Sequence, residues 1–385
     1  MIIVHVITRF IRGGADENTL LTCNGQADDG HEVHLIVGRE THPDILARLD
    51  RRVVLHQMPE LVHPIHPLMD IRAFASCFRL FRQLRPDIVH THESKAGIIG
   101  RWAAFCARVP HIVHGVHILA FVGNDSWTAP VYRVLEQVSA LITDAFVDVS
   151  IGMKDECLRA GIGQARHHHV VASGMDIDRY RRVARPRHWS EVIDPSLVAA
   201  YLREGSVQFI LMAGALEPRK RVLEFLSVIE PVLVDHPRCV LLISGDGVLM
   251  PQLQSRLNAP NLRGRVVALG HRDDLEVLIA LSDVCIHAAE REGLPRVVVQ
   301  FVAGGKPVAA ASLPGLDQII RDGVSGALVP GGNLAALADK IAQLLSDDAM
   351  RQLMAEQASQ MDLSEWDVRL MVRRLDDIYS TLRAS

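Results

Sequence analysis

Short apolar runs rich in β-branched residues alternate with amphipathic stretches along nearly the whole chain, and this alternation constrains the fold more than any other feature. Runs of this length, bounded by turn residues, predict strands buried on both faces of a parallel sheet. In the first half we expect strands at 2–7, 33–37, 88–90, 112–116 and 146–149, with helices at 15–28, 71–84 and 97–107. Strands and helices in regular alternation predict a doubly wound α/β domain.

The alternation is interrupted once and then begins again. Residues 173–206 are irregular and charged, which is typical of a connection between domains. Beyond them we expect strands at 209–213, 240–244, 266–269, 284–287 and 308–310, and helices at 222–234, 274–281, 296–303 and 334–345. A chain of 385 residues is long enough for two domains. We therefore predict α/β domains at 1–175 and 207–365, a connection at 176–206, and a last helix at 366–385 that returns to the first domain.

The bulk properties of the chain exclude several classes of function. The net charge of −4 gives no electrostatic reason to expect nucleic acid as a partner. No apolar run approaches the roughly 18 residues of a membrane-spanning helix, and residues 1–8 predict a strand instead of the basic start of a signal peptide. We therefore expect a cytoplasmic protein, at most a peripheral one on the inner face of the membrane.

One predicted helix, at 71–84, combines arginines with phenylalanines, and two interpretations of it stay open. A basic amphipathic helix can lie on anionic lipid through its apolar face. The same phenylalanines can instead pack into the core of the domain, and we favour this second interpretation. The side chains concerned are Arg72, Phe74, Phe78, Arg79, Phe81, Arg82 and, just beyond the helix, Arg85.

Gly13 and Gly14 follow the first predicted strand and precede a helix. Glycine lets the backbone approach a ligand closely, and the free N–H groups at a helix N-terminus attract anions. A plain tight turn explains the pair equally well. Neither the dinucleotide-binding G-x-G-x-x-G fingerprint nor a P-loop occurs in the sequence, so dehydrogenase and ATPase functions lose their main support.

Histidine is frequent, with 19 in the chain, but its spacing predicts no metal site. Residues 167–169 are three histidines in a polar stretch, which favours a solvated loop. His90 and His92 form an H-x-H pair, yet a metal site needs three or four ligands and no acidic cluster lies nearby in the sequence. We therefore expect strand-end histidines that face a cleft, and neither a metal nor another cofactor.

Two segments of the first half resemble the retaining glycosyltransferases of family 4. They are residues 13–20 (GGADENTL), followed by GHEV at 30–33, and residues 90–101 (HTHESKAGIIGR). The second segment is similar to one frequent in members that build bacterial surface polysaccharides. The resemblance implies the GT-B fold, in which two Rossmann-like domains face each other across a cleft. It also implies that Gly13 and Gly14 contact the donor and that Lys95 lies on the acceptor side.

The same resemblance implies a histidine beside the reacting sugar, at the end of the strand 112–116. We assign this role to His117, because a neutral imidazole can orient a sugar hydroxyl at the reaction centre. His114 is a competitor, and local packing of both histidines stays open. The threonine that the family carries in this strand is Gly115 here.

In the second half, residues 214–221 (GALEPRKR) resemble the family loop that carries a catalytic lysine. The resemblance implies that Lys220 stabilises the negative charge that develops on the leaving diphosphate, although a surface lysine is the alternative. The family arginine of this loop is Ala215 here. Arg219 or Arg221 can supply the missing charge, and we place Arg219 at the donor.

Three further segments resemble the donor site of the family: GDG at 245–247, GHRDD at 270–274 and EGLPRVVVQ at 292–300. The resemblance implies that Glu292 accepts hydrogen bonds from the sugar, and that the N–H groups of Gly293 and Leu294 open a helix and face the phosphates. Position 300 is then about two helical turns further along the same face. It is glutamine where the family has a ribose-binding glutamate, so it offers one acceptor oxygen without charge. The implied donor-binding set therefore includes Gly245, Gly247, His271, Gly293, Leu294 and Gln300.

The resemblance implies a metal-independent retaining hexosyltransferase. It would move a sugar from a nucleotide-sugar donor, favoured to be a UDP-sugar, to a polysaccharide or lipid-linked glycan, and it would need no cofactor. We expect a front-face displacement in which the leaving phosphate takes the acceptor proton. Two alternatives stay open: a sugar-nucleotide epimerase of the same architecture, and a catalytically degenerate protein that binds a nucleotide or a partner enzyme, to which Ala215 and Gln300 lend support.

Overall fold

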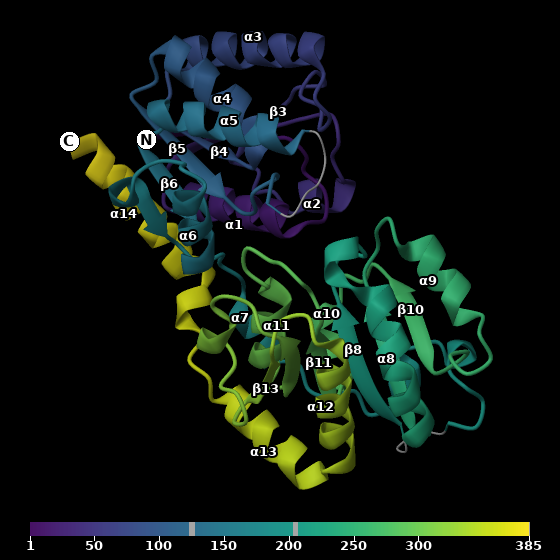
Figure 1. Ribbon diagram of the computed structural model, residues 1–385. Helices are drawn as coiled ribbons and strands as arrows, with labels where there is room; N and C mark the ends of the chain where they lie inside the picture. The colour runs from purple at the N-terminus through teal and green to yellow at the C-terminus, as the bar shows by residue number, and fades with distance from the viewer. Residues whose placement is uncertain (123–127, 203–206, 385) are drawn as a thin grey trace. The chain divides into compact units, whose positions relative to one another are not determined.

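The computed structural model describes residues 1–122, 128–202 and 207–384. Contacts divide the chain into two compact units, Met1–Met175 with Ser364–Ser385, and Asp176–Leu363 (Figure 1). Each unit contains one parallel sheet with helices on its faces, which confirms the expected α/β class. Among the described residues, no helix has both the length and the apolar character needed to cross a bilayer.

The first unit contains a seven-stranded parallel sheet in the order β3-β2-β1-β4-β5-β6-β7. The strands are β1 (Ile2–Ile7), β2 (Glu32–Val37), β3 (Val54–Gln57), β4 (Ile88–His92), β5 (His111–Val116), β6 (Ala145–Asp148) and β7 (His168–Val170). The order reverses between β1 and β4, and open α/β sheets bind ligands at the carboxyl ends of strands beside such a reversal. Strand β4 extends to His92, beyond the predicted end at 90. His168 and His169 lie in β7 and pair with β6. The prediction of a solvated loop at 167–169 is therefore wrong for these two residues.

Helices cover both faces of this sheet. They are α1 (Gly14–Asp28), α2 (Pro43–Ala47), α3 (Pro67–Leu84), α4 (Ser94–Ala107), α5 (Ala129–Ser139), α6 (Ile151–Arg159) and α14 (Val368–Ala384). Alternation along β1 sends Val4 and Val6 into the core under α3 and α4, and Ile3 and Ile7 into the cores under α14 and α1. The helices α3 and α4 lie on the face of the sheet opposite α1 and α14 (Figure 1).

The helix α14 belongs to the first unit although it follows the whole second unit in the chain. It packs beside α1, and the Met371 and Tyr379 side chains are buried under it. The Tyr379 hydroxyl lies 2.6 Å from His90 Nδ1. The segment before the helix joins Met175 to Trp366 through a backbone hydrogen bond of 2.9 Å.

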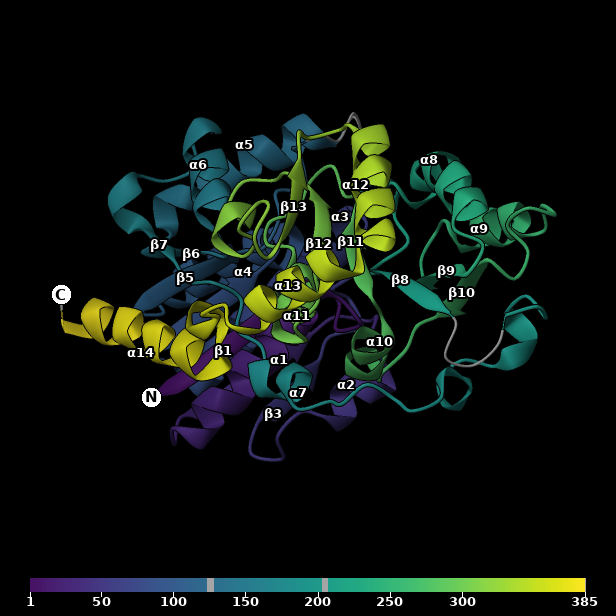
Figure 2. The ribbon, with the colours of Figure 1, turned by 90° about the horizontal axis from the view of Figure 1, so that it is seen from below.

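The second unit contains a six-stranded parallel sheet in the order β10-β9-β8-β11-β12-β13. The strands are β8 (Gln208–Ala213), β9 (Cys239–Ser244), β10 (Val266–Gly270), β11 (Val284–His287), β12 (Val308–Ala311) and β13 (Gly326–Val329). The helices are α7 (Ile177–Arg181), α8 (Val222–Asp235), α9 (Met250–Leu257), α10 (Leu275–Leu281), α11 (Arg296–Ala303), α12 (Leu334–Ser346) and α13 (Asp348–Ser359). Figure 2 shows α8 and α9 over the β8–β10 side of the sheet, and α12 beside β11–β13.

The segment 176–206, which the sequence marks as a connection, lies in this second unit as far as it is described. Its buried side chains anchor it there: Tyr180 is 9% exposed and Trp189 8%. The ring of Trp189 meets that of Phe209 edge-on, with 6.1 Å between their centroids. Short helical turns separated by charged residues have no sustained period, and the sequence therefore hides this packing.

Candidate active site

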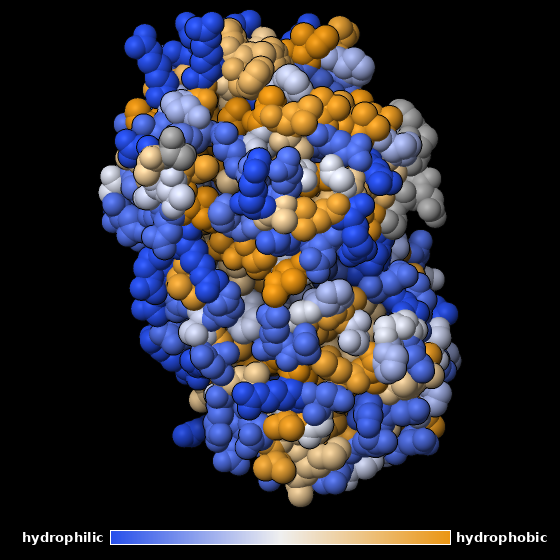
Figure 3. Space-filling view, turned by 60° about the vertical axis from the view of Figure 1, so that its left-hand side comes forward, coloured by the Kyte–Doolittle hydropathy of each residue, from blue (hydrophilic) through white to orange (hydrophobic). Residues whose placement is uncertain are grey.

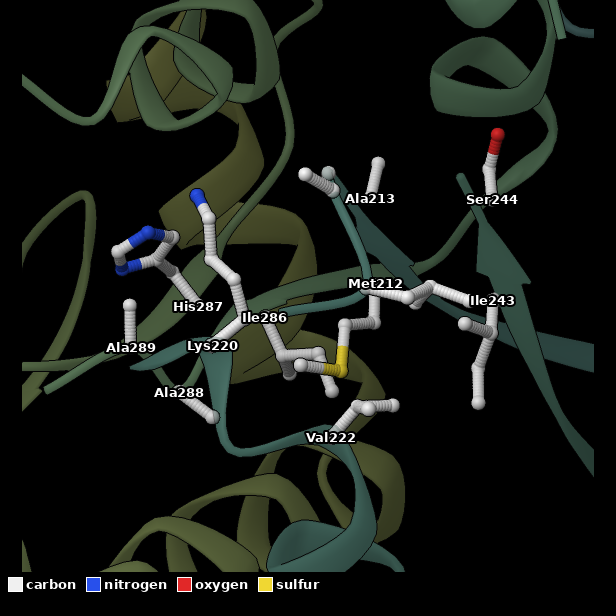
Figure 4. Close-up of a pocket in the computed structure, with 13 residues that line it drawn as sticks. Met212, Ala213, Lys220, Val222, Ile243, Ser244, Ile286, His287, Ala288 and Ala289 are labelled. Atoms are coloured by element: carbon white, nitrogen blue, oxygen red, sulfur yellow. The ribbon is translucent and has the colours of Figure 1, made fainter. Parts of the chain in front are cut away.

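A pocket of the second unit lies at the carboxyl ends of β8 and β11 (Figure 4). In Figure 4 the Lys220 amine and the His287 ring lie side by side and point to the same side of the sheet. The lining residues are Met212, Ala213, Gly214, Ala215, Leu216, Lys220, Val222, Ile243, Ser244, Ile286, His287, Ala288 and Ala289. Lys220, Ser244 and His287 carry the polar side chains of this lining; the other residues are apolar or, at Gly214, have no side chain. A few polar groups in an apolar pocket are typical of sites that fix the orientation of a ligand.

Glycines bring the loops after β8 and β9 together. Gly245 has φ of 143°, and a Cβ atom there would lie 1.9 Å from the Gly214 carbonyl oxygen. A Cβ atom at Gly247 would lie 2.6 Å from the Leu216 carbonyl oxygen. Only glycine fits such contacts at these φ values. Gly245 and Gly247, which the resemblance places at the donor, thus pack against the loop that carries Lys220.

Four charged or titratable side chains meet beside the pocket. Glu292 Oε1 contacts Lys220 Nζ, and Glu292 Oε2 lies 2.7 Å from Arg219 NH1. Arg219 also donates to Glu217 Oε2 at 2.8 Å, and its backbone carbonyl accepts from Glu290 N–H at 2.9 Å. These bonds fix the loop after β11 against the loop after β8. The structure therefore brings together Lys220 and Glu292, for which the resemblance implied donor-site roles, and Arg219, one of the two arginines considered for the missing charge.

Glu292 is held as a carboxylate. Burial opposes its charged form, but His287, Lys220 and Arg219 outweigh burial and hold the pKa of this carboxyl well below its usual range. Its side chain is only 10% exposed. With the more exposed Glu217 the two cations face two carboxylates, and Lys220 and Arg219 are the donors that a diphosphate ligand can engage.

His287 belongs to this site, and the sequence analysis missed it. Its Nε2 lies 3.7 Å from Glu292 Oε1, too far for a hydrogen bond, and neither ring nitrogen has a hydrogen-bond partner among the described residues. Burial lowers the pKa of His287, so the ring is neutral at pH 7. A histidine at the carboxyl end of an otherwise apolar strand was the available signal.

The helix after Glu292 begins later than the resemblance implied. Pro295 is the N-cap of α11 and Arg296 its first residue, so Gly293 and Leu294 lie in the loop before the helix. The Leu294 carbonyl accepts from Arg296 N–H at 2.9 Å. Gln300 is therefore in the second turn of α11, half-buried, and not two helical turns from Glu292. Neither Gln300 nor the exposed His271, which bonds Asp273 Oδ1 at 3.0 Å, is among the residues described as lining the pocket.

The first unit has its own pocket, beside His90, His92 and His117 at the end of the sheet. His117 Nε2 lies 3.2 Å from His92 Nδ1. His114 points to the opposite face, where Thr91 Oγ1 lies 2.9 Å from its Nδ1 under α4. Of the two competing histidines, His117 is the one in contact with the pocket.

The remaining predicted residues of the first unit are engaged by the protein itself. Lys95 is buried, donates to the Pro64 carbonyl at 2.7 Å and pairs with Asp70 Oδ1 at 2.6 Å. It thus ties α4 to the start of α3, which differs from the expected acceptor-side role. Gly13 is the N-cap and Gly14 the first residue of α1, and the Asp16 carboxyl lies where a side chain at Gly13 would project. Burial raises the pKa of Asp16 to about 6.

Comparisons with known proteins cover both units. A model of a "Glycosyl transferase 4-like domain" matches residues 13–174, and one of "Glycosyl transferases group 1" matches residues 197–361. A UDP-Gal:alpha-D-GlcNAc-diphosphoundecaprenol alpha-1,3-galactosyltransferase of Escherichia coli is 26% identical over 98% of this chain and 96% of its own.

Solved structures of low identity share the fold. Anabaena HepE in complex with UDP-glucose superimposes with a TM-score of 0.79 at 21% identity, over 99% of this chain and 100% of its own. WaaG, "a glycosyltransferase involved in lipopolysaccharide biosynthesis", superimposes with a TM-score of 0.77 at 15% identity, over 98% and 99% of the two chains.

Proposed function

The chain belongs to the GT-B glycosyltransferases of the family 4 kind, and we propose that it moves a hexose from a UDP-sugar to a lipid-linked or polysaccharide acceptor with retention of configuration. The observation that carries this proposal is the contact of Lys220 and Arg219 with Glu292, beside a pocket at the carboxyl ends of β8 and β11. The E. coli relative names a UDP-galactose donor and a lipid-linked acceptor. The solved relative HepE binds UDP-glucose.

In the proposed reaction the donor diphosphate lies against Lys220 and Arg219. The acceptor oxygen forms a bond to the anomeric carbon, and the bond from that carbon to the diphosphate oxygen breaks. The acceptor proton passes to the leaving phosphate on the same face, so the configuration is retained. Lys220 stabilises the charge that develops on the diphosphate. Glu292 forms ion pairs with two cations, which makes its carboxylate a poor nucleophile. The same carboxylate is suited to accept hydrogen bonds from sugar hydroxyls.

We propose that the donor diphosphate needs no divalent metal, because Lys220 and Arg219 supply the positive charge. Calorimetric titration of UDP into the full chain tests this. The dissociation constant is expected to be the same in excess EDTA and in Mg²⁺ or Mn²⁺. UDP binding that disappears in EDTA and returns with Mg²⁺ would contradict the proposal.

Incubation with nucleotide sugars in the absence of acceptor distinguishes the proposed function from its alternatives. A transferase slowly releases free sugar and the nucleoside diphosphate. An epimerase instead yields an isomeric nucleotide sugar, and a degenerate binding protein yields neither product. Absence of both UDP binding and sugar release across a panel of UDP-sugars would contradict the proposed function.

Gln300→Glu is expected to tighten UDP binding if Gln300 lies at the ribose. A hydrogen bond to a charged acceptor contributes about 1.5–3 kcal/mol, against about 0.5–1.5 kcal/mol for a neutral one. Since about 1.4 kcal/mol corresponds to a factor of ten, the gain in affinity approaches tenfold. Titration of UDP into both forms measures it. Unchanged affinity would mean that Gln300 is not at the donor site.

A peripheral membrane contact is the second part of the proposal, and its residues differ from those expected. The phenylalanines of α3 pack onto the core: Phe81 is buried, and Phe74 and Phe78 are half-buried. Instead α5 and the turn after it expose an apolar surface, with Val134 55% and Leu141 85% exposed. The apolar side chains of this surface are Val131, Val134, Leu135, Val138 and Leu141. In Figure 3 apolar groups gather among polar ones over the upper part, which is the first unit.

The helix α3 exposes arginines, including Arg72, Arg79 and Arg82. It is separated from this apolar surface by α4, which contacts both α3 and α5. Apolar and basic groups together suit an anionic bilayer surface. Sedimentation with phosphatidylglycerol vesicles is expected to retain the protein, and Leu141→Glu to release it. Leu353→Glu, at an exposed leucine of the second unit, is the matched control. Equal binding of all three forms would contradict this contact.

A further inference from the structure

A histidine of the second unit is buried at the pocket of Lys220 without a hydrogen-bond partner. His287 is the last residue of β11 and is 3% exposed, and both of its ring nitrogens lack a partner among the described residues. In Figure 4 its ring lies beside the Lys220 amine. Buried polar atoms in proteins nearly always have partners, so an exception at a ligand pocket calls for an explanation.

The strands on either side of His287 offer its ring no polar side chain. His287 is in register with Ala310 on β12. Ile286, which precedes it, is in register with Met212 on β8, so Ala213 comes next on that side. Residues in register point to the same face of a sheet, and alanine has no polar side-chain atom. A partner for the ring must therefore come from the loops beyond the strand ends.

The charged groups that act on His287 come from these loops, and they are Glu292, Lys220 and Arg219. His287 Nε2 lies 3.7 Å from Glu292 Oε1, beyond hydrogen-bond distance. The same oxygen contacts Lys220 Nζ, while Glu292 Oε2 lies 2.7 Å from Arg219 NH1. Since N–H···O bonds are about 2.7–3.2 Å long, a shift of roughly 0.5–1 Å would bring Oε1 into a hydrogen bond with the imidazole.

The two cations that hold Glu292 differ in their other contacts. Arg219 Nε donates to Glu217 Oε2 at 2.8 Å, and Arg219 NH1 donates to the Arg291 carbonyl at 3.3 Å. The Lys220 amine has the Glu292 carboxylate as its one described partner. An ammonium group on a flexible stem can turn its donors to a new acceptor more readily than a guanidinium that is bonded on several sides. Lys220 is therefore the cation that a phosphate can take from Glu292.

We propose that His287 is the second partner of Glu292: when the donor diphosphate binds Lys220, Glu292 Oε1 exchanges the lysine amine for His287 Nε2–H, while Oε2 stays on Arg219. This inference rests on the proposed function, because a diphosphate must reach Lys220. His287 is then a positioning residue that acts through Glu292. The exchange makes the Lys220 charge available to the leaving diphosphate and keeps the carboxylate in place.

The ionisation state of His287 suits this exchange. Burial lowers the pKa of His287, so the ring is neutral at pH 7. A neutral imidazole can donate one N–H to a carboxylate. It brings no further positive charge that would compete with Lys220 for the diphosphate.

The test is a calorimetric titration of UDP into the full chain and two variants at His287. His287→Leu removes the N–H donor, and we expect it to weaken UDP binding by about tenfold or more, because Glu292 then loses one bond when UDP takes Lys220. His287→Gln places an amide N–H near the position of Nε2 and is expected to restore most of the affinity. Neither variant is expected to lower the Tm of the free chain, in which the ring makes no described hydrogen bond.

The same leucine substitution in a Lys220→Ala chain separates the exchange from direct contact with the nucleotide. Without the lysine, Glu292 can accept from His287 before UDP arrives. His287→Leu is then expected to leave the UDP affinity of the Lys220→Ala chain unchanged. A loss equal to that in the parent chain would mean that His287 contacts the nucleotide itself, and it would overturn the exchange.

His236→Leu is the matched control. His236 lies in the same unit, and its ring faces the Val232 carbonyl at 2.9 Å through Nδ1 and Ser346 Oγ at 3.0 Å through Nε2. Its UDP affinity is expected to equal that of the parent chain. The inference is overturned if His287→Leu binds UDP as the parent does, if His287→Gln is as weak as His287→Leu, or if His236→Leu is equally weak. A parent chain that binds no UDP contradicts the proposed function itself, whereas these three outcomes in a parent chain that binds UDP overturn the exchange alone.

Discussion

Lys220→Ala is expected to lower kcat by about 10² or more, because one preorganised donor or cation at a developing charge contributes about 2.7–4 kcal/mol. The Lys220 side chain is 14% exposed and is held against Glu292, so it is ordered before the donor arrives. Ordering in advance is what makes such a group effective in the transition state. Initial rates of release of the nucleoside diphosphate, measured with saturating donor, give the comparison.

Arg221→Ala is the matched control for this substitution. Arg221 follows Lys220 directly, but its guanidinium bonds the Gly332 carbonyl on the exposed surface. The control is expected to keep turnover close to that of the parent chain. If Lys220→Ala also keeps parental turnover, the donor site does not lie in this pocket.

Glu292→Gln is expected to lower transfer by a similar factor and also to destabilise the second unit. The substitution removes the charge that Lys220 and Arg219 share; Arg219 keeps its ion pair with Glu217, but Lys220 loses its carboxylate partner. Breaking a buried ion pair by removing one partner costs about 3–5 kcal/mol. For a unit of this size, about 3 kcal/mol corresponds to a fall in Tm of roughly 6–12 °C. Scanning calorimetry with and without UDP measures the loss.

Glu217→Gln provides the matched comparison. Glu217 also accepts from Arg219, at 2.8 Å, but its side chain is 44% exposed, and its described contact with Lys220 is a backbone hydrogen bond that the substitution leaves in place. An exposed ion pair contributes only about 0–1 kcal/mol, so Tm and turnover are expected to change little. Equal effects of the two substitutions would show that the contact with Lys220 has no special importance.

The sequence predicted most strands of both sheets, because their apolar runs are continuous and bounded by turns. It missed β3, where Val54 and Leu55 are 44% and 40% exposed and polar residues follow. It also missed β7, which has only three residues, two of them histidines, and β13 (Gly326–Val329), which has only four and begins with glycine. All three are edge strands, and none of them contains the long continuous apolar run of a central parallel strand.

Within the site, the sequence identified those functional residues whose motif lies within a single loop. The segments around Lys220 and Glu292 were recognisable alone, and the fold brings them into contact. His287 was missed because its role depends on the neighbouring loop. The approach of His92 and His117 depends on strand register, which a pattern along one segment does not encode. Lys95 was placed on the acceptor side by resemblance, whereas the start of α3 occupies its amine.

The position of α14 has a consequence for the order of events during translation. Residues 176–363 form a continuous unit that can fold as soon as it leaves the ribosome. The first unit, although made earlier, lacks α14 until the residues after 367 emerge, and until then Ile3, Ile88 and Val113 lack part of their cover and His90 lacks Tyr379. The half of the protein that is synthesised first is therefore completed last, and a released chain that ends before residue 368 would carry a complete second unit behind an unfinished first one.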